Sequence, residues 1–180
     1  MFQCARFVSG VFLHAAIFYT VAHLQASSSS TAYVTICCNA PSTVSVFNAA
    51  TLVPSRSLVT GSGGDDIALS PNGKKMFVTV DTKRQLQVID TSTGAVLATI
   101  PIPIRVSGMP PLEIVMNPDG AHVYVFAPQV VPNSLLLAVD TTNQVTASQN
   151  IAFSGSLGPL LASPEGKHLY FEIGFVNQYI

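Results

Sequence analysis

A turn signature recurs three times along the chain: Ser or Asn, then Pro, one variable residue and Gly. Its prolines follow one another at steps of 47 and 46 residues. Pro presets φ for a tight turn and Gly supplies the positive φ that the turn needs. A period in the forties, with short apolar strands between the turns, is typical of a stack of small β-sheets. The predicted structural turns are centred on Pro71 and Gly73, Pro118 and Gly120, and Pro164 and Gly166.

Each turn is followed by a stretch with strand composition. Lys75–Val80, His122–Phe126 and His168–Ile173 all begin four residues after a turn proline, and Ala32–Ile36 is an earlier copy. Helical periodicity is absent after residue 30, and Pro recurs often enough to break any long helix. The sequence therefore predicts an all-β fold after the N-terminal segment.

One unit can be assigned strand by strand, with four strands joined by polar turns. Continuous apolar runs such as Met76–Val78 and Leu135–Val139 indicate that both faces of a sheet are covered. Only 9% of the residues are charged and the mean hydropathy is +0.45, which agrees with such packing. Four-stranded sheets stacked face to face are the blades of a β-propeller. The predicted strands of this unit are Ile67–Ser70, Lys75–Val80, Gln85–Ile89 and Ala95–Ile102.

The strands also resemble a known repeat family. Ala32–Thr35 and Met76–Val80 are similar to the Tyr-Val-Thr-Asn strand of YVTN β-propeller repeats, Ile67–Lys74 to its turn and Val88–Thr91 to its third strand. The resemblance covers roughly residues 31–173, but Ile36 and Val80 stand where the family has Asn. It implies a secreted or surface-associated bacterial propeller, whose relatives often have seven blades. The family has no agreed catalytic residues, so the resemblance transfers none.

The predicted organisation is a signal peptide over 1–26, a Ser-rich linker over 27–31 and an incomplete propeller over 32–180. The repeat units are placed at about 32–66, 67–111, 112–158 and 159–180. The fold class is thus all-β, with antiparallel four-stranded blades forming a partial β-propeller after an N-terminal signal helix.

The leader assignment rests on Arg6, the apolar run Phe7–Leu24 and a plausible cleavage site after Ala26. A flexible tract, Ser27–Ser30, follows it. We expect a secreted, periplasmic or cell-surface protein with no membrane contact beyond the leader. An uncleaved signal anchor and a mistaken start site are the alternatives.

The length without a leader corresponds to between three and four units of about 45 residues, whereas the smallest closed propellers have about four blades. Three interpretations follow: a fragment of a longer protein, a truncated reading frame, or a short arc that completes itself by association. The first two are favoured together.

Composition excludes several classes of function. The net charge is −1 with no basic stripe, so no nucleic-acid partner is expected. No nucleophile elbow, phosphate loop or His-Glu-x-x-His motif occurs, and Gly61–Gly64 lacks the Lys of a phosphate loop. Cys37 and Cys38 are two free thiols or, less simply, a vicinal disulfide. They have no partners at zinc-site spacing.

One pair of carboxylates is a candidate metal site. Asp66 and Glu113 each lie five residues before a turn proline, so both begin the innermost strand of successive units. They could meet at the mouth of the central channel and bind a hard cation such as Ca²⁺. Solvated loop acids are the favoured interpretation, because Pro159 ends the series. His122 and His168 share a register with Lys75, which favours an exposed polar position.

Two functions remain. The leading hypothesis is an exported binding or scaffold module without a catalytic centre or a cofactor, which contacts a protein or polymer ligand. The alternative is part of a lactonase-like or metal-dependent hydrolase propeller, with Asp66 and Glu113 beside a channel metal.

Overall fold

The computed structural model describes residues 24–26, 31–36, 42–61, 64–80, 83–103, 113–128, 133–140, 142–152 and 156–174. These residues form antiparallel β-strands joined by turns and short loops, so the predicted all-β class is confirmed. The segment with Cys37 and Cys38 lies outside the described residues, as do residues 1–23.

Within these ranges the strands form three four-stranded sheets and one two-stranded sheet, each in simple sequence order. We call them blades 1 to 4. Blade 1 holds β1 (Leu24–Ala26), β2 (Thr31–Ile36), β3 (Ser42–Asn48) and β4 (Pro54–Gly61). Blade 2 holds β5 (Gly64–Leu69), β6 (Lys75–Val80), β7 (Gln85–Asp90) and β8 (Val96–Pro101). Blade 3 holds β9 (Glu113–Met116), β10 (His122–Pro128), β11 (Asn133–Asp140) and β12 (Val145–Ala152), and blade 4 holds β13 (Ser156–Ala162) and β14 (Leu169–Gly174).

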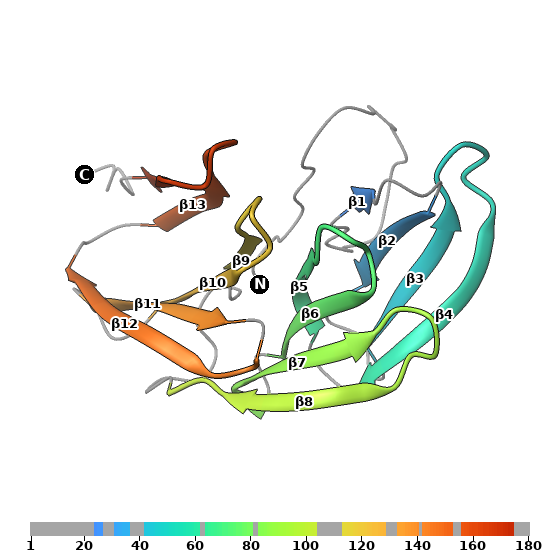
Figure 1. Ribbon diagram of the computed structural model, residues 1–180, viewed down its shortest axis with the longest axis horizontal. Coiled ribbons are helices and arrows are strands. Elements are labelled where there is room, and N and C mark those ends of the chain that lie inside the picture. Colours follow the sequence, from blue (N-terminus) through green and yellow to red (C-terminus); the bar gives the residue numbers. More distant parts are fainter. Residues whose placement is uncertain are drawn as a thin grey trace, which may run out of the picture.

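The blades are arranged as a fan around their first strands (Figure 1). β1, β5 and β9 lie toward the centre of the fan, and β4, β8 and β12 lie at its periphery. Along the centre, β5 contacts β1 and β2 on one side and β9 on the other, and β9 in turn contacts β13. This is the radial stacking that the apolar runs predict.

The predicted strands of the second unit agree with blade 2. The expected strand 75–80 is β6 with the same bounds, whereas the expected first strand 67–70 begins three residues earlier, at Gly64 in β5. The predicted turns are also confirmed, because Gly73, Gly120 and Gly166 have φ values of 68°, 71° and 70°. Each turn therefore uses a conformation that side chains with a Cβ rarely adopt.

The start of the chain differs from expectation. Leu24–Ala26, predicted as the end of a signal helix, is strand β1 and pairs with Ala32–Val34 of β2. The rest of that predicted helix lies outside the described residues, so nothing supports a helix there. The three-residue stretch has no strand pattern of its own, and its pairing with β2 is what defines it.

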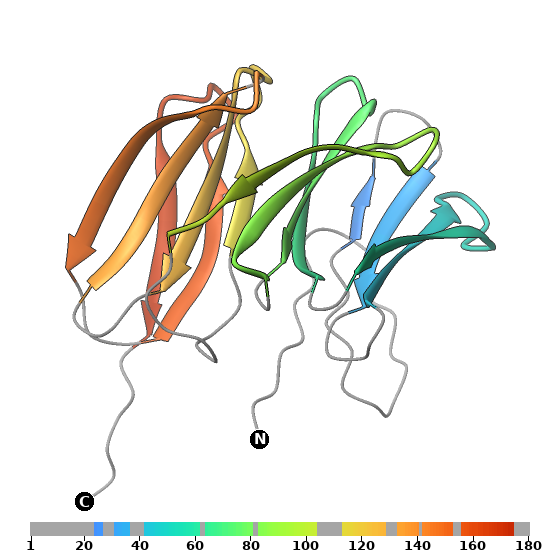
Figure 2. The same cartoon turned by 90° about the horizontal axis from the view of Figure 1, so that it is seen from below.

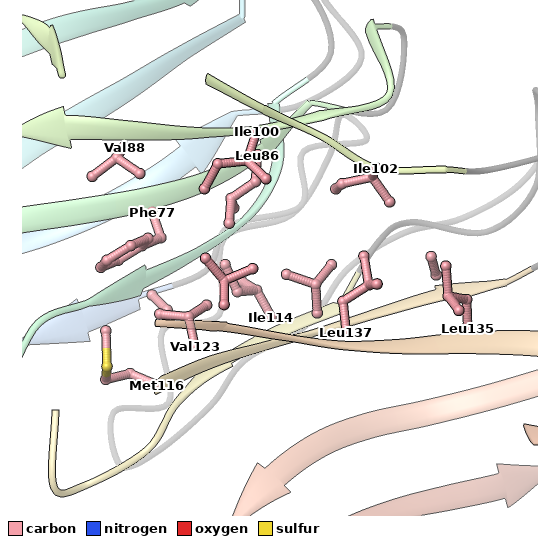
Figure 3. Close-up of a cluster of buried hydrophobic side chains, with 14 residues drawn as sticks. Phe77, Leu86, Val88, Ile100, Ile102, Ile114, Met116, Val123, Leu135 and Leu137 are labelled. Carbon is pink, nitrogen blue, oxygen red and sulfur yellow. The ribbon is translucent and has the colours of Figure 1, made fainter. Parts of the chain in front are cut away.

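The larger of the two hydrophobic clusters among the described residues lies between blades 2 and 3 (Figure 3). Phe77, Leu86 and Val88 project from blade 2 toward Val123 and Leu137 of blade 3, and all five are at most 2% exposed. A buried side chain of this kind stabilises the fold by about 1.5–3 kcal/mol relative to an exposed one.

The opposite face of blade 2 packs on blade 1. Met76, Val78 and Ile89 of blade 2 are fully buried in a second cluster, together with Val44 and Val46 of blade 1. Blade 2 is therefore covered on both faces, which explains why β6 is apolar at successive positions rather than at alternate ones.

Candidate binding surface at the turn face

The turns between first and second strands and those between third and fourth strands lie at the same end of the blades, which we call the turn face (Figure 2). In blade 2, the Thr91 hydroxyl donates a hydrogen bond of 2.6 Å to the carbonyl oxygen of Gly73. The Thr91 backbone N–H also donates to the carbonyl of Lys74 at 3.1 Å. The two turns of the blade are thus tied into one unit.

Each turn between first and second strands is closed by its own backbone. The N–H of Gly73 donates to the Ser70 carbonyl at 2.8 Å, and Gly120 and Gly166 make the same bond in blades 3 and 4. In blade 2 the Ser70 hydroxyl also accepts a bond from the Lys75 N–H at 2.9 Å. These turns provide a well-ordered frame for the side chains that they carry.

Neighbouring turns approach one another closely. A Cβ placed on Gly120 would lie 3.0 Å from two ring carbons of Pro71 in the preceding blade, and one on Gly166 would lie 2.6 Å from Oδ1 of Asn117. Glycine is therefore required at these two turns for two reasons: it adopts a positive φ, and it leaves room for the neighbouring blade.

In the turns between third and fourth strands, the side-chain oxygen of an Asp or Asn accepts hydrogen bonds from the residues that follow it. Oδ1 of Asp90 accepts hydrogen bonds from the Ser92 hydroxyl at 2.6 Å and from the Thr93 N–H at 2.8 Å. The Ser92 side-chain bond is the main cause that lowers the Asp90 pKa to about 2. Asn48 accepts equivalent bonds from Ala50 and Thr51 in blade 1.

Blade 1 is also fastened to the turn face of blade 2. The Arg56 guanidinium on β4 donates to the carbonyl oxygen of Ser92 at 2.6 Å and to that of Thr91. Since Thr91 is itself bonded to Gly73, a continuous set of hydrogen bonds runs from the edge of blade 1 to the turn of blade 2.

A groove of about 360 Å³ opens on the turn face between blades 2 and 3. Its inner wall includes the buried side chains of Phe77 and Met116. Its rim is polar and carries Asn72, Lys74 and Asp119. Ser70, Pro71, Lys75 and Gly120 complete the lining.

The charged side chains around this groove differ in their exposure and in their neighbours. Lys74 is exposed and Lys75 is half-buried opposite Asp90 in the strand register. The facing turn contributes one carboxylate, Asp119, whose Oδ1 accepts a bond of 2.8 Å from the N–H of Ala121. Because Lys75 faces the Asp90 carboxylate, the exposed Lys74 is the cation that an acidic ligand can reach.

The predicted metal residue Asp66 has a different environment from the one expected. It is 3% exposed, so the favoured interpretation of solvated loop acids is wrong for it. One carboxylate oxygen accepts the N–H of Ile67 at 2.7 Å, and the other accepts the N–H of Ile114 in blade 3 at 3.0 Å. Asp66 thus joins the inner strands of two blades.

The strand pairing at this position explains the geometry. The register of β5 against β6 shifts between Gly64 and Ile67, which leaves the Asp66 N–H outside the regular ladder. The Thr79 hydroxyl accepts that N–H at 3.0 Å. A buried polar residue is therefore needed within the otherwise apolar stretch Met76–Val80 of β6.

Glu113 begins β9 and is 8% exposed, so it is buried as well. Among the residues that the structure describes, no three His, Cys, Asp or Glu side chains lie close enough together to hold a metal ion. The Ca²⁺ site at Asp66 and Glu113 remains a prediction. The exposed position expected for the two histidines holds for His168, whereas His122 is half-buried beside the ring of Tyr124.

Sequence reasoning missed the residues that define the turn face. Arg56 does not recur at the equivalent position of another repeat unit, so no pattern in the sequence singled it out. The groove forms only where turns from two different blades come together. Asp119 is the variable residue of one turn signature and Lys74 directly follows another, so both positions were visible in the sequence. Their proximity was not, because it depends on how adjacent blades stack.

Comparison with known proteins shows the fold alone. No family model and no curated protein matches this chain. Among solved structures, Kuenenia stuttgartiensis hydrazine synthase is similar with a TM-score of 0.66 at 20% identity, over 84% of this chain and 49% of that one. The WD40 domain of Toxoplasma gondii coronin has a TM-score of 0.66 at 14% identity, over 87% and 40%. A functionally unknown protein from Desulfotomaculum acetoxidans DSM 771 has a TM-score of 0.62 at 15% identity, over 91% and 51%.

The radial blades and these neighbours together define a protein of the β-propeller class. The chain spans about half the length of the solved structures that it matches. In the described part of the chain, no helix is long and apolar enough to cross a membrane.

Proposed function

We propose that this chain is an exported β-propeller module of the YVTN type that binds an acidic polymer or protein segment at its turn face and carries no catalytic centre. The observation that carries the proposal is the groove between the turns of blades 2 and 3, with its apolar inner wall and the exposed Lys74 at its rim. The turns beside it are held by their own hydrogen bonds, so little ordering is needed on binding.

Lys74 is the residue on which binding is expected to depend most. It is exposed at the groove rim, where a carboxylate of the ligand can reach it. Because an exposed ion pair contributes little, we expect Lys74→Ala to weaken binding by about threefold at low salt. Higher salt should weaken the binding of the unaltered protein as well.

The test uses the full chain with polyglutamate and polygalacturonate as probes and neutral dextran as the comparison, measured by isothermal titration calorimetry. Lys167 is the matched control, because it stands at the same turn position in blade 4 and does not line the groove. Weaker binding in Lys74→Ala with no change in Lys167→Ala supports the proposal. Absence of binding to both acidic probes, or equal losses in the two variants, would contradict it.

The YVTN assignment is supported by the role of Thr79 at the third position of the Tyr-Val-Thr triplet. Thr35 holds the same position in blade 1 and is 1% exposed. In that repeat, the threonine would serve to satisfy backbone groups where the first strand is irregular.

Export is proposed from Arg6 and the apolar run that follows it. Since Leu24–Ala26 forms β1, cleavage after Ala26 would remove the first strand of blade 1. N-terminal sequencing of protein recovered outside the cytoplasm gives the processing site. Retention of the whole chain inside the cell would contradict export.

A further inference from the structure

The turn of blade 2 carries an Asn-Gly pair, Asn72-Gly73, and the equivalent turn of blade 3 carries an Asp-Gly pair, Asp119-Gly120. The sequence contains no other Asn or Asp that is followed directly by glycine. Asn72 and Asp119 both line the groove between the two blades. The two pairs therefore lie in facing turns of one groove.

An asparagine followed by glycine can convert itself without an enzyme. The backbone nitrogen of the glycine attacks the side-chain carbonyl carbon, Cγ, and forms a five-membered imide. The Cγ–Nδ2 bond breaks, and ammonia leaves with the proton of the glycine nitrogen. Water then opens the imide at either of its two carbonyl carbons and gives aspartate or isoaspartate. Glycine favours the reaction because it has no Cβ to obstruct the ring.

The structure exposes Asn72 and holds its amide in a way that assists this attack. The Oδ1 atom accepts a hydrogen bond of 2.8 Å from the Ser70 hydroxyl and one of 3.0 Å from the Lys74 N–H. Attack at Cγ turns this oxygen into an oxyanion, and two donors that already point at it stabilise the developing charge. The side-chain carbonyl is therefore polarised toward attack.

The attacking nitrogen is restrained in the closed turn. The Gly73 N–H donates to the Ser70 carbonyl at 2.8 Å, so this bond must open before the nitrogen can reach Cγ. The two central residues of the turn, Pro71 and Asn72, are exposed, so local opening uncovers little apolar surface. The closed turn therefore slows the reaction relative to an unfolded chain, but the turn is inexpensive to open.

We propose that Asn72 is a self-modification site, which converts in the folded protein to aspartate and isoaspartate and places a new negative charge at the rim of the groove. The aspartate product is compatible with the turn, because Asp119 occupies the same position in blade 3 and accepts the N–H of Ala121 there at 2.8 Å. Beside Lys74, the new carboxylate would repel an acidic ligand. This consequence rests on the proposed function, whereas the modification itself does not.

The experiment incubates the folded full chain in mildly alkaline buffer made with water enriched in heavy oxygen. Peptide mass spectrometry detects conversion, since opening of the imide incorporates heavy oxygen, and chromatography separates the aspartate and isoaspartate peptides. The internal control is Asn150, which is exposed on β12 and is followed by the β-branched Ile151. We expect Asn72 to convert about tenfold faster than Asn150, a difference of about 1.4 kcal/mol in the barrier.

Two variants separate the charge from the reaction. Asn72→Gln keeps the amide but would have to form a larger ring, so conversion at this turn should fall below detection. Asn72→Asp carries the product charge from the start and should bind polyglutamate about threefold more weakly than Asn72→Gln at low salt. Both side chains suit the turn, because Asp119 and Glu165 stand at its equivalent positions. Circular dichroism verifies that each variant is folded.

A sample unfolded in guanidinium chloride is the positive control, because the turn no longer restrains the glycine nitrogen there. An intact Asn72 in the folded chain, after an incubation that converts it in the unfolded one, would overturn the proposal. So would equal conversion of Asn72 and Asn150 in the folded chain.

The binding measurements test the consequence separately. Equal binding of polyglutamate by Asn72→Asp and Asn72→Gln would contradict the effect of the new charge at the groove. Conversion of Asn72 in a chain that binds neither acidic probe would leave the modification site intact and contradict only the proposed function.

Discussion

At the scale of single residues, the turns between third and fourth strands each contain a left-handed residue in three blades, four residues after Asn48 and Asp90 and three residues after Asp140. Leu52, Gly94 and Asn143 have φ values of 55°, 76° and 68°. Leucine is the unfavourable member, because its Cβ crowds the backbone in this region. We predict that Leu52→Gly raises the free energy of unfolding by about 0.5–1 kcal/mol, as relief of strain exceeds the added chain entropy.

Urea denaturation measures this change. Asn143→Gly is the matched control and should give a smaller gain, since asparagine tolerates the left-handed region. A lower stability for Leu52→Gly would show that contacts of the leucine side chain, which is 43% exposed, outweigh the backbone strain.

The second residue-scale prediction concerns Asp90 and pH. Its pKa is lowered from 3.8 to about 2, first by the Ser92 side chain and then by the Thr93 N–H. Because the Asp90 pKa is lower in the folded state, its carboxylate stabilises the fold fully at pH values above the ordinary pKa of 3.8. This stabilisation is lost as the pH falls through about 2. Asp90→Asn should therefore be less stable than the unaltered protein at neutral pH, and the difference should shrink between pH 3.8 and about 2.

Thermal unfolding at a series of pH values checks this prediction. The substitution converts the turn to the type that Asn48 already forms in blade 1, so the fold should be retained. A difference that stays constant across the acid range would mean that the charge of Asp90 is irrelevant to stability.

Some of these residue roles could be predicted from the sequence and others could not. The turn glycines were predictable, because Pro-x-Gly has a direct backbone meaning. The burial of Asp66 was not, since it depends on β5 beginning at Gly64 and on an irregular register that no local pattern indicates. The partner of its second oxygen, Ile114, comes from another blade.

At the scale of elements, Asp66 joins the inner strands β5 and β9. Its two carboxylate oxygens accept the N–H groups of Ile67 and Ile114. In Asp66→Asn one of these N–H groups would face the amide NH₂, so two donors would meet in a buried site. We predict a loss of about 2 kcal/mol in the free energy of unfolding.

Denaturant titration measures that loss. Asp119→Asn is the matched control, because Asp119 lies on an exposed turn and its amide oxygen can still accept the bond from Ala121. A bound Ca²⁺ at Asp66 would instead make stability depend on chelators. Equal stabilities of the two variants would contradict the role of Asp66 between the blades.

The elements themselves were largely predictable. The continuous apolar run in β6 indicated a sheet covered on both faces, and the structure buries Met76 to Val80 completely. The run Leu135–Val139 in β11 was interpreted in the same way, yet Leu136 and Ala138 are only half-buried. Those two side chains are directed toward blade 4, which has no third or fourth strand among the described residues to cover them.

At the scale of the whole molecule, the sequence repeat predicted that the blades stack radially, but it did not predict which residues form the first strand of blade 1. β1 falls in a stretch that was assigned to the leader, and it is recognisable only through its pairing with β2. The groove of the turn face likewise exists only because blades 2 and 3 stack. The sequence pattern therefore could not predict β1 or the groove, because both depend on contacts between strands or blades that are not encoded locally.

The same stacking predicts how stability is distributed within the fan. β6 and β10 have a paired strand on each side and several fully buried side chains, whereas β12 is a peripheral strand whose side chains are nearly all exposed. We predict that hydrogen exchange followed by mass spectrometry finds the slowest amides in β6 and β10 and much faster ones in β12. Local opening of a peripheral strand breaks one ladder and exposes little apolar surface, whereas exchange in β6 requires blade 2 to separate from both neighbours. Exchange at one rate across blade 3 would mean that each blade opens as a single unit, with contacts between blades setting the stability of all its strands together.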